Sequence, residues 1–245
     1  RLADFQDRPS HADLLHVDLW HEGMNLALDA GTYLYNASPP WDNALTRTQV
    51  HNTVLVDEQE QMRRVGRFLY LEWAHTQVVS CEQRRDGSLK KLVAQHNGYA
   101  RLGVSHQRTL SAQDDSTWLV EDHIFELKAA QKQTANPHVL CLQLLLPDHP
   151  WFLENRENGL DINLDTHTGR IKLSLNVKAD TLSAVPLQVK VIRAGELLEG
   201  DGNVSPTWGW SSPCYGEKIP ALAIHCRLES QLPVLLTSRW IFYEG

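Results

Sequence analysis

The segment 171–178 reads Ile-Lys-Leu-Ser-Leu-Asn-Val-Lys, and its side chains alternate between apolar and polar at every position. In an extended chain, successive side chains point to opposite faces, so this pattern gathers the apolar groups on one face. It is typical of a β-strand with one face in a core and the other in solvent. The same alternation recurs in the segments 15–20 and 222–229.

Turn-forming residues separate such segments at short intervals, at positions 22–23, 86–88, 97–98, 158–159, 168–169 and 200–203. Gly, Asn and Asp favour tight turns, so strand and turn repeated in this way predict antiparallel sheets. No long segment carries a helical stripe. The sequence therefore predicts an all-β protein, a large antiparallel β-sandwich with residues 1–245 as a single domain. A small C-terminal subdomain after about residue 180 is the alternative.

The charge balance excludes one class of partner. The chain has 245 residues and a formal net charge of -7, from 30 acidic and 23 basic side chains. Nucleic-acid binders need basic side chains to neutralise phosphates, so no nucleic-acid partner is expected. A local cluster of Arg and His can still bind an anionic sugar. No apolar run reaches the roughly 20 residues that cross a bilayer, so no membrane partner is expected either.

The N-terminus and the cysteines leave the compartment open. Residues 1–10 are charged and lack the apolar centre of a signal peptide. The four cysteines have no CxxC or metal-type spacing, which favours buried free thiols over a disulfide framework. The densest polar block, residues 8–13, begins close to the start. We therefore expect further sequence to precede this segment in the full-length protein.

The candidate chemistry lies in the first 61 residues. Two imidazoles, His11 and His51, and the carboxylates Asp13 and Asp29 stand near the ends of successive strand-like segments. Two His and one carboxylate, with water as the fourth ligand, suit zinc. The same set with more open positions suits non-haem Fe(II). With twelve His in the chain, ordinary surface or hydrogen-bonded histidines remain the alternative.

An ordered set of short blocks resembles the heparinase II/III-like family of bacterial polysaccharide lyases. The blocks are His11–Trp20, Leu28–Tyr35, Arg47, His51–Asp57, Tyr99–Leu102, His106–Leu110 and Trp208–Lys218. The resemblance implies a C-terminal β-sandwich that in full-length relatives follows an N-terminal α/α toroid, which this chain lacks. It also implies β-elimination on an acidic polysaccharide containing uronic acid, and a periplasmic or secreted location.

The resemblance also implies a metal site. Family members with a mapped metal hold zinc through the positions that are here His11, Asp29 and His51. We expect the zinc to be structural, because it ties together three loops facing the substrate cleft. The main catalytic groups belong to the toroid, so the isolated chain is expected to be inactive or nearly so.

The chain also departs from the family pattern. A second catalytic His of some members is here Pro9, and a catalytic Tyr of others is absent from the loop 41–45. We therefore assign no catalytic residue. Arg47 is the candidate contact for a sugar carboxylate, unless it pairs with a nearby Asp. Tyr35 is a second candidate sugar contact, although a buried strand tyrosine is the more ordinary interpretation.

Two other functions stay open. One is a non-catalytic carbohydrate-binding β-sandwich, motivated by the absent catalytic His and Tyr. The other is an iron oxygenase, in which Asp13 replaces Asp29 to complete a facial triad with His11 and His51. Outside these blocks, His106 and Arg108 are expected to hydrogen-bond internally. His16, His21 and His123 are expected to be ordinary strand residues.

Overall fold

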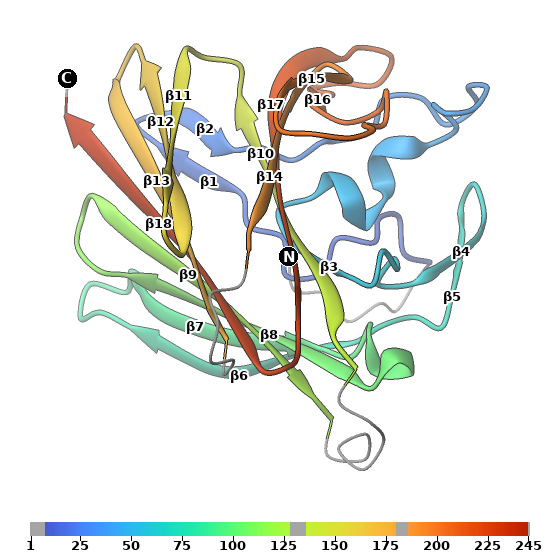
Figure 1. Cartoon of the computed structure of the whole chain (residues 1–245), viewed down its shortest axis with the longest axis horizontal. Helices are drawn as coiled ribbons and strands as arrows, with labels where there is room; N and C mark the ends of the chain where they lie inside the picture. Colours follow the sequence, from blue (N-terminus) through green and yellow to red (C-terminus); the bar gives the residue numbers. More distant parts are fainter. Residues whose placement is uncertain (1–7, 128–135, 180–185, 245) are drawn as a thin grey trace.

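Two antiparallel sheets pack face to face in the computed structural model (Figure 1). The structure describes residues 8–127, 136–179 and 186–244. The predicted all-β antiparallel sandwich is confirmed, and only three short 3-10 helices interrupt it within these residues. Residues 1–7 of the charged N-terminus and the boundary near residue 180 lie outside the described residues. No helix of the described chain is long and apolar enough to span a membrane.

The larger sheet has eight strands. Their spatial order is β11 (Trp151–Arg156), β12 (Gly159–Thr166), β13 (Gly169–Ala179), β18 (Val234–Glu244), β9 (Thr117–Glu126), β8 (Val104–Ala112), β7 (Leu89–His96) and β6 (Thr76–Gln83). Hairpin turns at Asn158 and Thr168 join β11 to β12 and β12 to β13, as the turn signals predict. The last strand, β18, lies between β13 and β9, so the C-terminal segment joins the two halves of the sheet.

The second sheet lies across the core from the first. Its order is β15 (Glu196–Glu199), β14 (Gln188–Arg193), β17 (Ile219–Ser230), β10 (His138–Pro147) and β3 (Val54–Val56), with β16 (Trp210–Ser211) also paired to β17. Two hairpins stand outside the sheets, β1 (Leu19–His21) with β2 (Met24–Ala27) and β4 (Arg63–Gly66) with β5 (Leu69–Leu71). The 3-10 helices are η1 (Ala44–Thr46), η2 (Thr48–Val50) and η3 (Ala100–Leu102).

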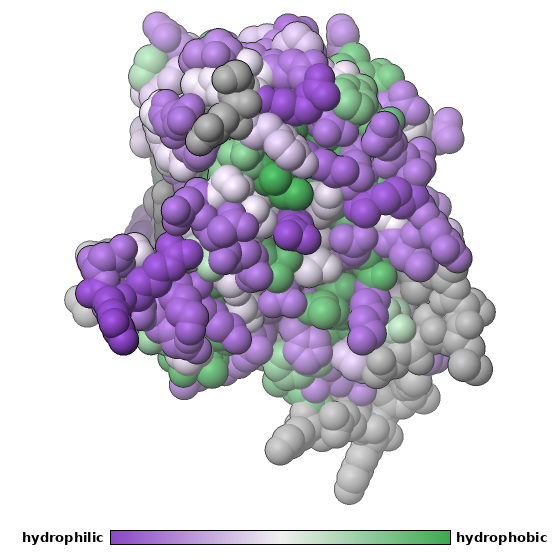
Figure 2. Space-filling view, turned by 90° about the vertical axis from the view of Figure 1, so that its left-hand side faces the viewer, coloured by the Kyte–Doolittle hydropathy of each residue, from purple (hydrophilic) through white to green (hydrophobic). Residues whose placement is uncertain are grey.

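The alternating segments form the core as predicted. On β13, Ile171, Leu173 and Leu175 are buried, and on β17 Leu222 and Ile224 are buried in the same cluster. Their polar neighbours point away from that cluster. The side of the molecule on which the eight-stranded sheet lies is largely hydrophilic, with apolar side chains in smaller patches (Figure 2). One buried face and one solvated face is the normal state of an antiparallel sheet.

The outer face of the second sheet is partly covered by loops, which lie on the right-hand side of Figure 1. Ala30, Leu45 and Val50 pack there against Leu145 and Ile192 of the sheet. This second apolar cluster fixes the loops that carry the candidate metal ligands.

One expected strand is only partly formed. The alternation of segment 15–20 predicts an extended chain, but β1 begins only at Leu19. Leu15 has a positive φ of 61°. An L-residue in this left-handed region turns the chain, so the segment before β1 is a loop. The prediction was wrong there because Ala12 and Leu14 are buried by packing against Met62, Tyr70 and Ala74, not by pairing in a sheet.

Candidate metal centre

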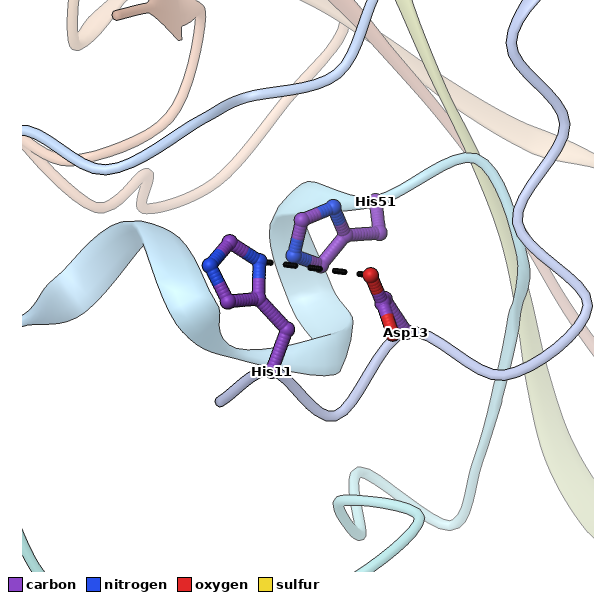
Figure 3. A group of neighbouring side chains, drawn as sticks. All are labelled: His11, Asp13 and His51. Carbon is purple, nitrogen blue, oxygen red and sulfur yellow. Dashed lines mark ion pairs between the residues drawn. The ribbon is translucent and has the colours of Figure 1, made fainter. Parts of the chain in front are cut away.

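Three loops that are separate in the sequence meet just before β3. The first is the segment 11–16, the second is the segment 29–32 after β2, and the third is His51, which directly follows η2. His11, Asp13 and His51 point towards one another in this space (Figure 3).

The distances within this group fit a metal site. One ligand atom from each of His11, Asp13 and His51 lies within 4.8 Å of the other two. Nδ1 of His11 is 3.9 Å from Oδ2 of Asp13, and the two imidazole centroids are 5.2 Å apart. His51 and Asp13 are buried, and His11 is partly exposed. Two imidazoles and a carboxylate that face one space are suitable donors for zinc.

Asp29 lies in the same neighbourhood. Its Oδ1 is 3.5 Å from Nδ1 of His51 and accepts a 2.9 Å hydrogen bond from the N–H of Gly31. Burial alone would raise the pKa of Asp29, but the imidazoles of His51, His16 and His11 and the Gly31 N–H together lower it to about 2. Asp29 is therefore ionised near neutral pH, as a metal ligand must be.

His16 is a third imidazole that the sequence did not single out. Its expected role as a strand residue was wrong, because it lies in the loop before β1. Its ring meets that of His51 edge-on, with centroids 5.3 Å apart, and its Nδ1 accepts a 3.0 Å hydrogen bond from the N–H of Asn52. The spacing His11-x-Asp13-x-x-His16 was the signal that could have identified it.

Hydrogen bonds between the loops hold the first and third loops in register. Ala12 donates its N–H to the carbonyl of Thr46 at 2.9 Å, and Thr48 Oγ1 donates back to the Ala12 carbonyl at 2.7 Å. Thr53 Oγ1 donates to the Leu14 carbonyl at 3.0 Å. These bonds bracket His11, Asp13 and His51 on both sides, so the ligands are positioned by the protein itself.

The side chain of Asn52 links this region to both neighbouring segments. Its Nδ2 donates to the carbonyls of Val17 at 2.8 Å and Leu28 at 3.0 Å. Its Oδ1 accepts the N–H of Leu145 from β10 at 2.6 Å. Asn52 thus donates two hydrogen bonds and accepts one, which a side-chain amide can do because it carries both an N–H₂ group and a carbonyl oxygen. The orientation of the adjacent His51 follows from this anchoring.

Arg108 joins the same loops to the eight-stranded sheet. It forms a two-point pair with buried Asp122, at 2.6 Å from Nε and 2.8 Å from Nη2. Its Nη1 donates to the carbonyls of Leu15 at 2.5 Å and Asn52 at 2.6 Å. The internal hydrogen bonding predicted for this arginine is confirmed. The guanidinium therefore fastens both loops that carry His11 and His51.

A chain of imidazoles ends on the same aspartate. The Gly98 N–H donates to Nδ1 of His96 at 3.0 Å, so His96 must carry its proton on Nε2. That Nε2 faces Nδ1 of His106 at 3.0 Å, and Nε2 of His106 then donates to Asp122 at 2.6 Å. If each ring carries its proton on Nε2 and accepts at Nδ1, every hydrogen bond from the Gly98 N–H to Asp122 has one donor and one acceptor, and both rings are neutral. Burial accordingly lowers the pKa of both His96 and His106, well below the ordinary value for His96.

This network predicts a pH-dependent stability. In the unfolded chain His96 and His106 take up protons below about pH 6.5, whereas in the folded chain they resist protonation. The free energy of unfolding should therefore fall as the pH drops from 7 to 5, by up to about 1.4 kcal/mol per pH unit for each ring. Urea unfolding across this range measures the slope. His96→Gln should reduce the slope, whereas His123→Gln, at an exposed position of β9, should not. Equal slopes in wild type and His96→Gln would contradict the assignment.

Gly31 is required for the second loop to reach its place. Its φ is 70°, and a Cβ added there would lie 2.2 Å from the carbonyl oxygen of Ser212. Ser212 donates its N–H to the Ala30 carbonyl at 2.8 Å and its Oγ to the Thr32 carbonyl at 3.0 Å. Gly31 thus allows the backbone beside Asp29 to pack directly on the segment after β16.

Gly31→Ala should therefore disturb both stability and metal binding. We expect a loss of more than the roughly 1–3 kcal/mol of backbone strain alone, because the clash with Ser212 is added. Gly87→Ala is the matched control, since Gly87 also has a positive φ but has nothing within 4 Å of an added Cβ. Chemical unfolding and zinc titration of both variants test this. Equal effects of the two substitutions would exclude the close approach as the cause.

The two predicted sugar contacts are placed differently. Tyr35 is 42% exposed and lies in a loop, so the interpretation as a buried strand tyrosine was wrong. Arg47 is half-buried between η1 and η2. Neither Asp considered as its partner pairs with it, since Asp42 pairs with Arg64 and Asp57 with His138. Arg47 forms no ion pair among the described residues, but its charge acts on the buried carboxyl of Glu60, where it opposes the rise in pKa that burial causes.

Aromatic side chains surround Tyr35. Its ring lies 4.9 Å from that of Tyr215 and 5.3 Å from that of Phe68, and both partners are largely exposed. The loop 41–45 contributes Trp41 to a neighbouring group, in which the ammonium of Lys218 lies over the rings of Trp41, Trp210 and Tyr33. The exposed rings of Tyr35, Phe68 and Tyr215 can stack on the apolar faces of sugars, whereas Tyr33, Trp41 and Trp210 are only partly exposed.

Solved structures match this arrangement of strands. A heparinase III gene product superposes with a TM-score of 0.67 at 14% identity, over 96% of this chain and 31% of that one. The heparan sulfate lyase HepC from Pedobacter heparinus gives a TM-score of 0.64 at 15% identity, over 96% and 31%. A further heparinase III gives 0.65 at 12% identity, over 96% and 30%. At these identities the likeness establishes the fold.

The sequence itself identifies the family. The family described as heparinase II/III-like, C-terminal, matches residues 3–229, which is most of the chain. No curated protein matches. The chain spans about 30% of the length of the solved relatives. This chain therefore belongs to the heparinase II/III-like family and represents its C-terminal region.

Proposed function

We propose that this chain is the C-terminal β-sandwich of a polysaccharide lyase that cleaves a uronic-acid-containing polysaccharide by β-elimination. The observation that supports this most is the family match over residues 3–229. The metal-site loops and the exposed aromatic rings are consistent with it. β-Elimination requires neutralisation of the uronate carboxylate, removal of the proton next to it, and protonation of the leaving oxygen.

Within this chain, the proposed roles are in binding. Arg47 offers a cation without an ion-pair partner among the described residues, and it can pair with a uronate carboxylate. Tyr35 and Tyr215 offer exposed rings for the sugar faces. No described group is assigned as the base or acid, because the positions of the family's second His and loop Tyr hold Pro9 and the sequence 41–45.

An α/α toroid is proposed to complete the substrate site. Support comes from the β4–β5 hairpin and its flanks, where Val65, Phe68, Leu69, Leu71 and Trp73 are all 37–45% exposed. An exposed group of large apolar side chains is typical of a surface that packs against another domain. The aromatic rings beside Tyr35 adjoin this hairpin through Phe68. The substrate would then bind between the two domains.

Zinc is the proposed metal, held by His11, His51 and one carboxylate. Donors on one tetrahedral zinc lie about 3.4 Å apart, given bonds of about 2.1 Å. The group spans up to 4.8 Å, so modest side-chain rotation brings the donors to that spacing. Zinc there would link the loops that precede β1 and β3. The role we propose is structural, which is consistent with the burial of His51.

The identity of the carboxylate ligand separates two hypotheses. The resemblance selects Asp29, whereas an iron oxygenase would use Asp13, which lies within 4.8 Å of both imidazoles. We expect Asp29→Ala to lower the zinc affinity by 10-fold or more, and Asp13→Ala to have the smaller effect through lost support of His11. Zinc titration of both variants measures this. Loss of metal only in Asp13→Ala, with iron bound in the wild type, would favour the oxygenase.

The lyase proposal is tested by activity. The full-length protein should release unsaturated uronate from a panel of acidic polysaccharides, followed by ultraviolet absorbance, and this chain alone should release little or none. Arg47→Met in the full-length protein should raise KM. The control is Arg84→Met, in the turn between β6 and β7, which should leave KM unchanged. Oligosaccharide binding without any cleavage by the full-length protein would favour the non-catalytic carbohydrate-binding alternative.

A further inference from the structure

The outer face of the second sheet changes its chemistry along the strands. The register of β10, β17 and β14 aligns side chains in rows of three across the sheet. The first row, Leu145, Ala223 and Ile192, is apolar and is covered by the loops described above. The next two rows are mainly polar. They are Gln143 with His225 and Lys190, and Cys141 with Arg227 and Gln188.

A cavity opens over these polar rows. It has a volume of about 430 Å³, within the range of about 300–1,000 Å³ typical of small-molecule sites. Trp208, Gln49 and Asn203 form its walls together with the strands. The ring of Trp208 lies 4.4 Å from that of His225, so an aromatic surface lies beside the polar rows. The loops cover the apolar row, and Lys190, Arg227 and Gln188 of the polar rows reach the surface, whereas Gln143 and His225 are buried.

The charge in this cavity is positive, although the whole chain is acidic. Lys190 donates to the carbonyl of Asn203 at 2.9 Å, and Arg227 contacts the side-chain oxygen of Gln188 at 3.4 Å. Both partners are neutral, and neither cation forms an ion pair with a carboxylate among the described residues. Glu58 is the one acidic residue among the lining residues. Two cations without a carboxylate partner can therefore receive an anionic group.

The wall of the cavity also holds polar atoms that the described chain does not satisfy. Oε1 of Gln143 and Nε1 of Trp208 are buried and have no hydrogen-bond partner among the described residues. Gln143 itself is only 3% exposed. An unsatisfied buried polar group costs about 1–3 kcal/mol, so its retention at a cavity wall favours a ligand that completes its hydrogen bonds. An acceptor and a donor are both present, which suits a hydroxyl group.

We propose that this cavity is a second carbohydrate-binding site, separate from the metal centre, that takes an acidic sugar unit. Lys190 and Arg227 bind the carboxylate or sulfate. Gln143 and Trp208 serve the hydroxyl groups, after a small side-chain adjustment that exposes their buried polar atoms. His225 is buried and its pKa is lowered to about 3 by burial and by Lys190, so it is a neutral ring in this site. The ligand class follows from amides, an indole and two cations around one space.

The position of the site suggests how it would serve the enzyme. Gln49 in its wall belongs to η2, and His51 follows that helix directly. The cavity and the metal centre are thus connected through one short segment. A polysaccharide held in the cavity would stay tethered near the cleft between catalytic events. This role rests on the proposed lyase function, whereas binding to the cavity does not.

The test uses the whole chain and a defined probe. A tetrasaccharide of alternating glucuronate and N-acetylglucosamine is titrated and followed by calorimetry and by ¹H–¹⁵N spectra. We expect the side-chain amide of Gln143 and the indole of Trp208 to shift. The double variant Lys190→Met with Arg227→Met should weaken binding by 10-fold or more. The matched control removes two exposed cations from the eight-stranded sheet, Lys90→Met with Arg170→Met, and should bind like the wild type.

Each alternative outcome overturns a stated part. Undiminished binding by the Lys190/Arg227 variant, or an absence of binding by the wild type, would overturn the site. Equal binding of a carboxyl-reduced tetrasaccharide would overturn the requirement for an anion. Inorganic sulfate is added as a competitor, and displacement of the tetrasaccharide would show that the two cations also accept sulfate. Shifts confined to residues around Tyr35 and Arg47 would place the sugar at the proposed cleft instead. Zinc content, measured on the same samples, reports on the metal centre independently.

Discussion

Asp122→Ala should destabilise the protein by about 3–5 kcal/mol, which is the usual cost of leaving a buried charge without its partner. Asp122 is fully buried and accepts hydrogen bonds from both Arg108 and His106. Burial alone would raise the pKa of Asp122, but Arg108 and His106 hold it far below its ordinary range. The aspartate is therefore an anion in the folded protein, and its removal leaves the buried Arg108 cation without a counter-ion.

Urea unfolding at neutral pH measures this loss. Asp165→Ala is the control, because Asp165 pairs with Arg170 at the surface and should cost less than about 1 kcal/mol. The double replacement Arg108→Met with Asp122→Leu should recover part of the loss, since it removes both charges. A loss below 1 kcal/mol in Asp122→Ala would mean that Arg108 finds another partner, and would refute its role as the link between loops and sheet.

His51→Ala should abolish the proposed metal binding. His51 is completely buried at the point where the three loops meet, within reach of His11, Asp13 and Asp29. Removal of one of three protein ligands leaves too few donors for tight zinc binding. Metal bound to the folded state stabilises it by about 2.7 kcal/mol when free zinc exceeds the Kd 100-fold. A chelator should therefore lower the Tm of the wild type and leave the Tm of His51→Ala unchanged.

The control for this prediction is His123→Ala, which removes an exposed imidazole from β9. It should keep the response of the wild type to the chelator. If both variants responded to the chelator equally, the metal would not depend on His51. A wild type that gave no response at all would indicate that any bound metal does not stabilise the fold.

The fold was predictable because its longest strands obey the simplest pattern. Segments 171–178 and 222–229 alternate strictly, and each forms one strand with its apolar side chains in the core. The hairpin turns at Asn158 and Thr168 also follow from local sequence. The four cysteines are free, as their spacing predicts, but the expectation that they are buried holds for Cys226 and is wrong for the exposed Cys81 and Cys214. These features depend on neighbours in the chain, so the sequence carries them directly.

The loop before β1 was not predictable in this way. Its residues Leu15 and Val17 alternate with polar side chains, but the positive φ of Leu15 and the hydrogen bond of Arg108 to this loop make it irregular. Arg108 lies about ninety positions further along the chain. Long-range hydrogen bonds of this kind overrule local alternation, and no pattern in one sequence reveals them. The place of His16 beside His51 was also missed, although the spacing His11-x-Asp13-x-x-His16 was a local signal for it.

The site was predictable in its imidazoles and not in its carboxylates. His11 and His51 came from the resemblance, and the structure places them 5.2 Å apart by ring centroids. Asp13 forms the close group with both imidazoles, within 4.8 Å, whereas Asp29, which the resemblance implied, lies 3.5 Å from His51 and is not a member of that group. Tyr35 was a candidate sugar contact for which burial in a strand was the more ordinary interpretation, yet β2 ends at Ala27 and Tyr35 is exposed in a loop.

Elemental analysis of the purified wild-type chain after dialysis tests the central claim most directly. The account predicts about one zinc ion per chain, held where the loops of His11, Asp29 and His51 meet. The absence of any bound metal would contradict the site and would leave these histidines as ordinary polar residues of a β-sandwich. Stoichiometric iron in place of zinc would instead favour the ligand set with Asp13.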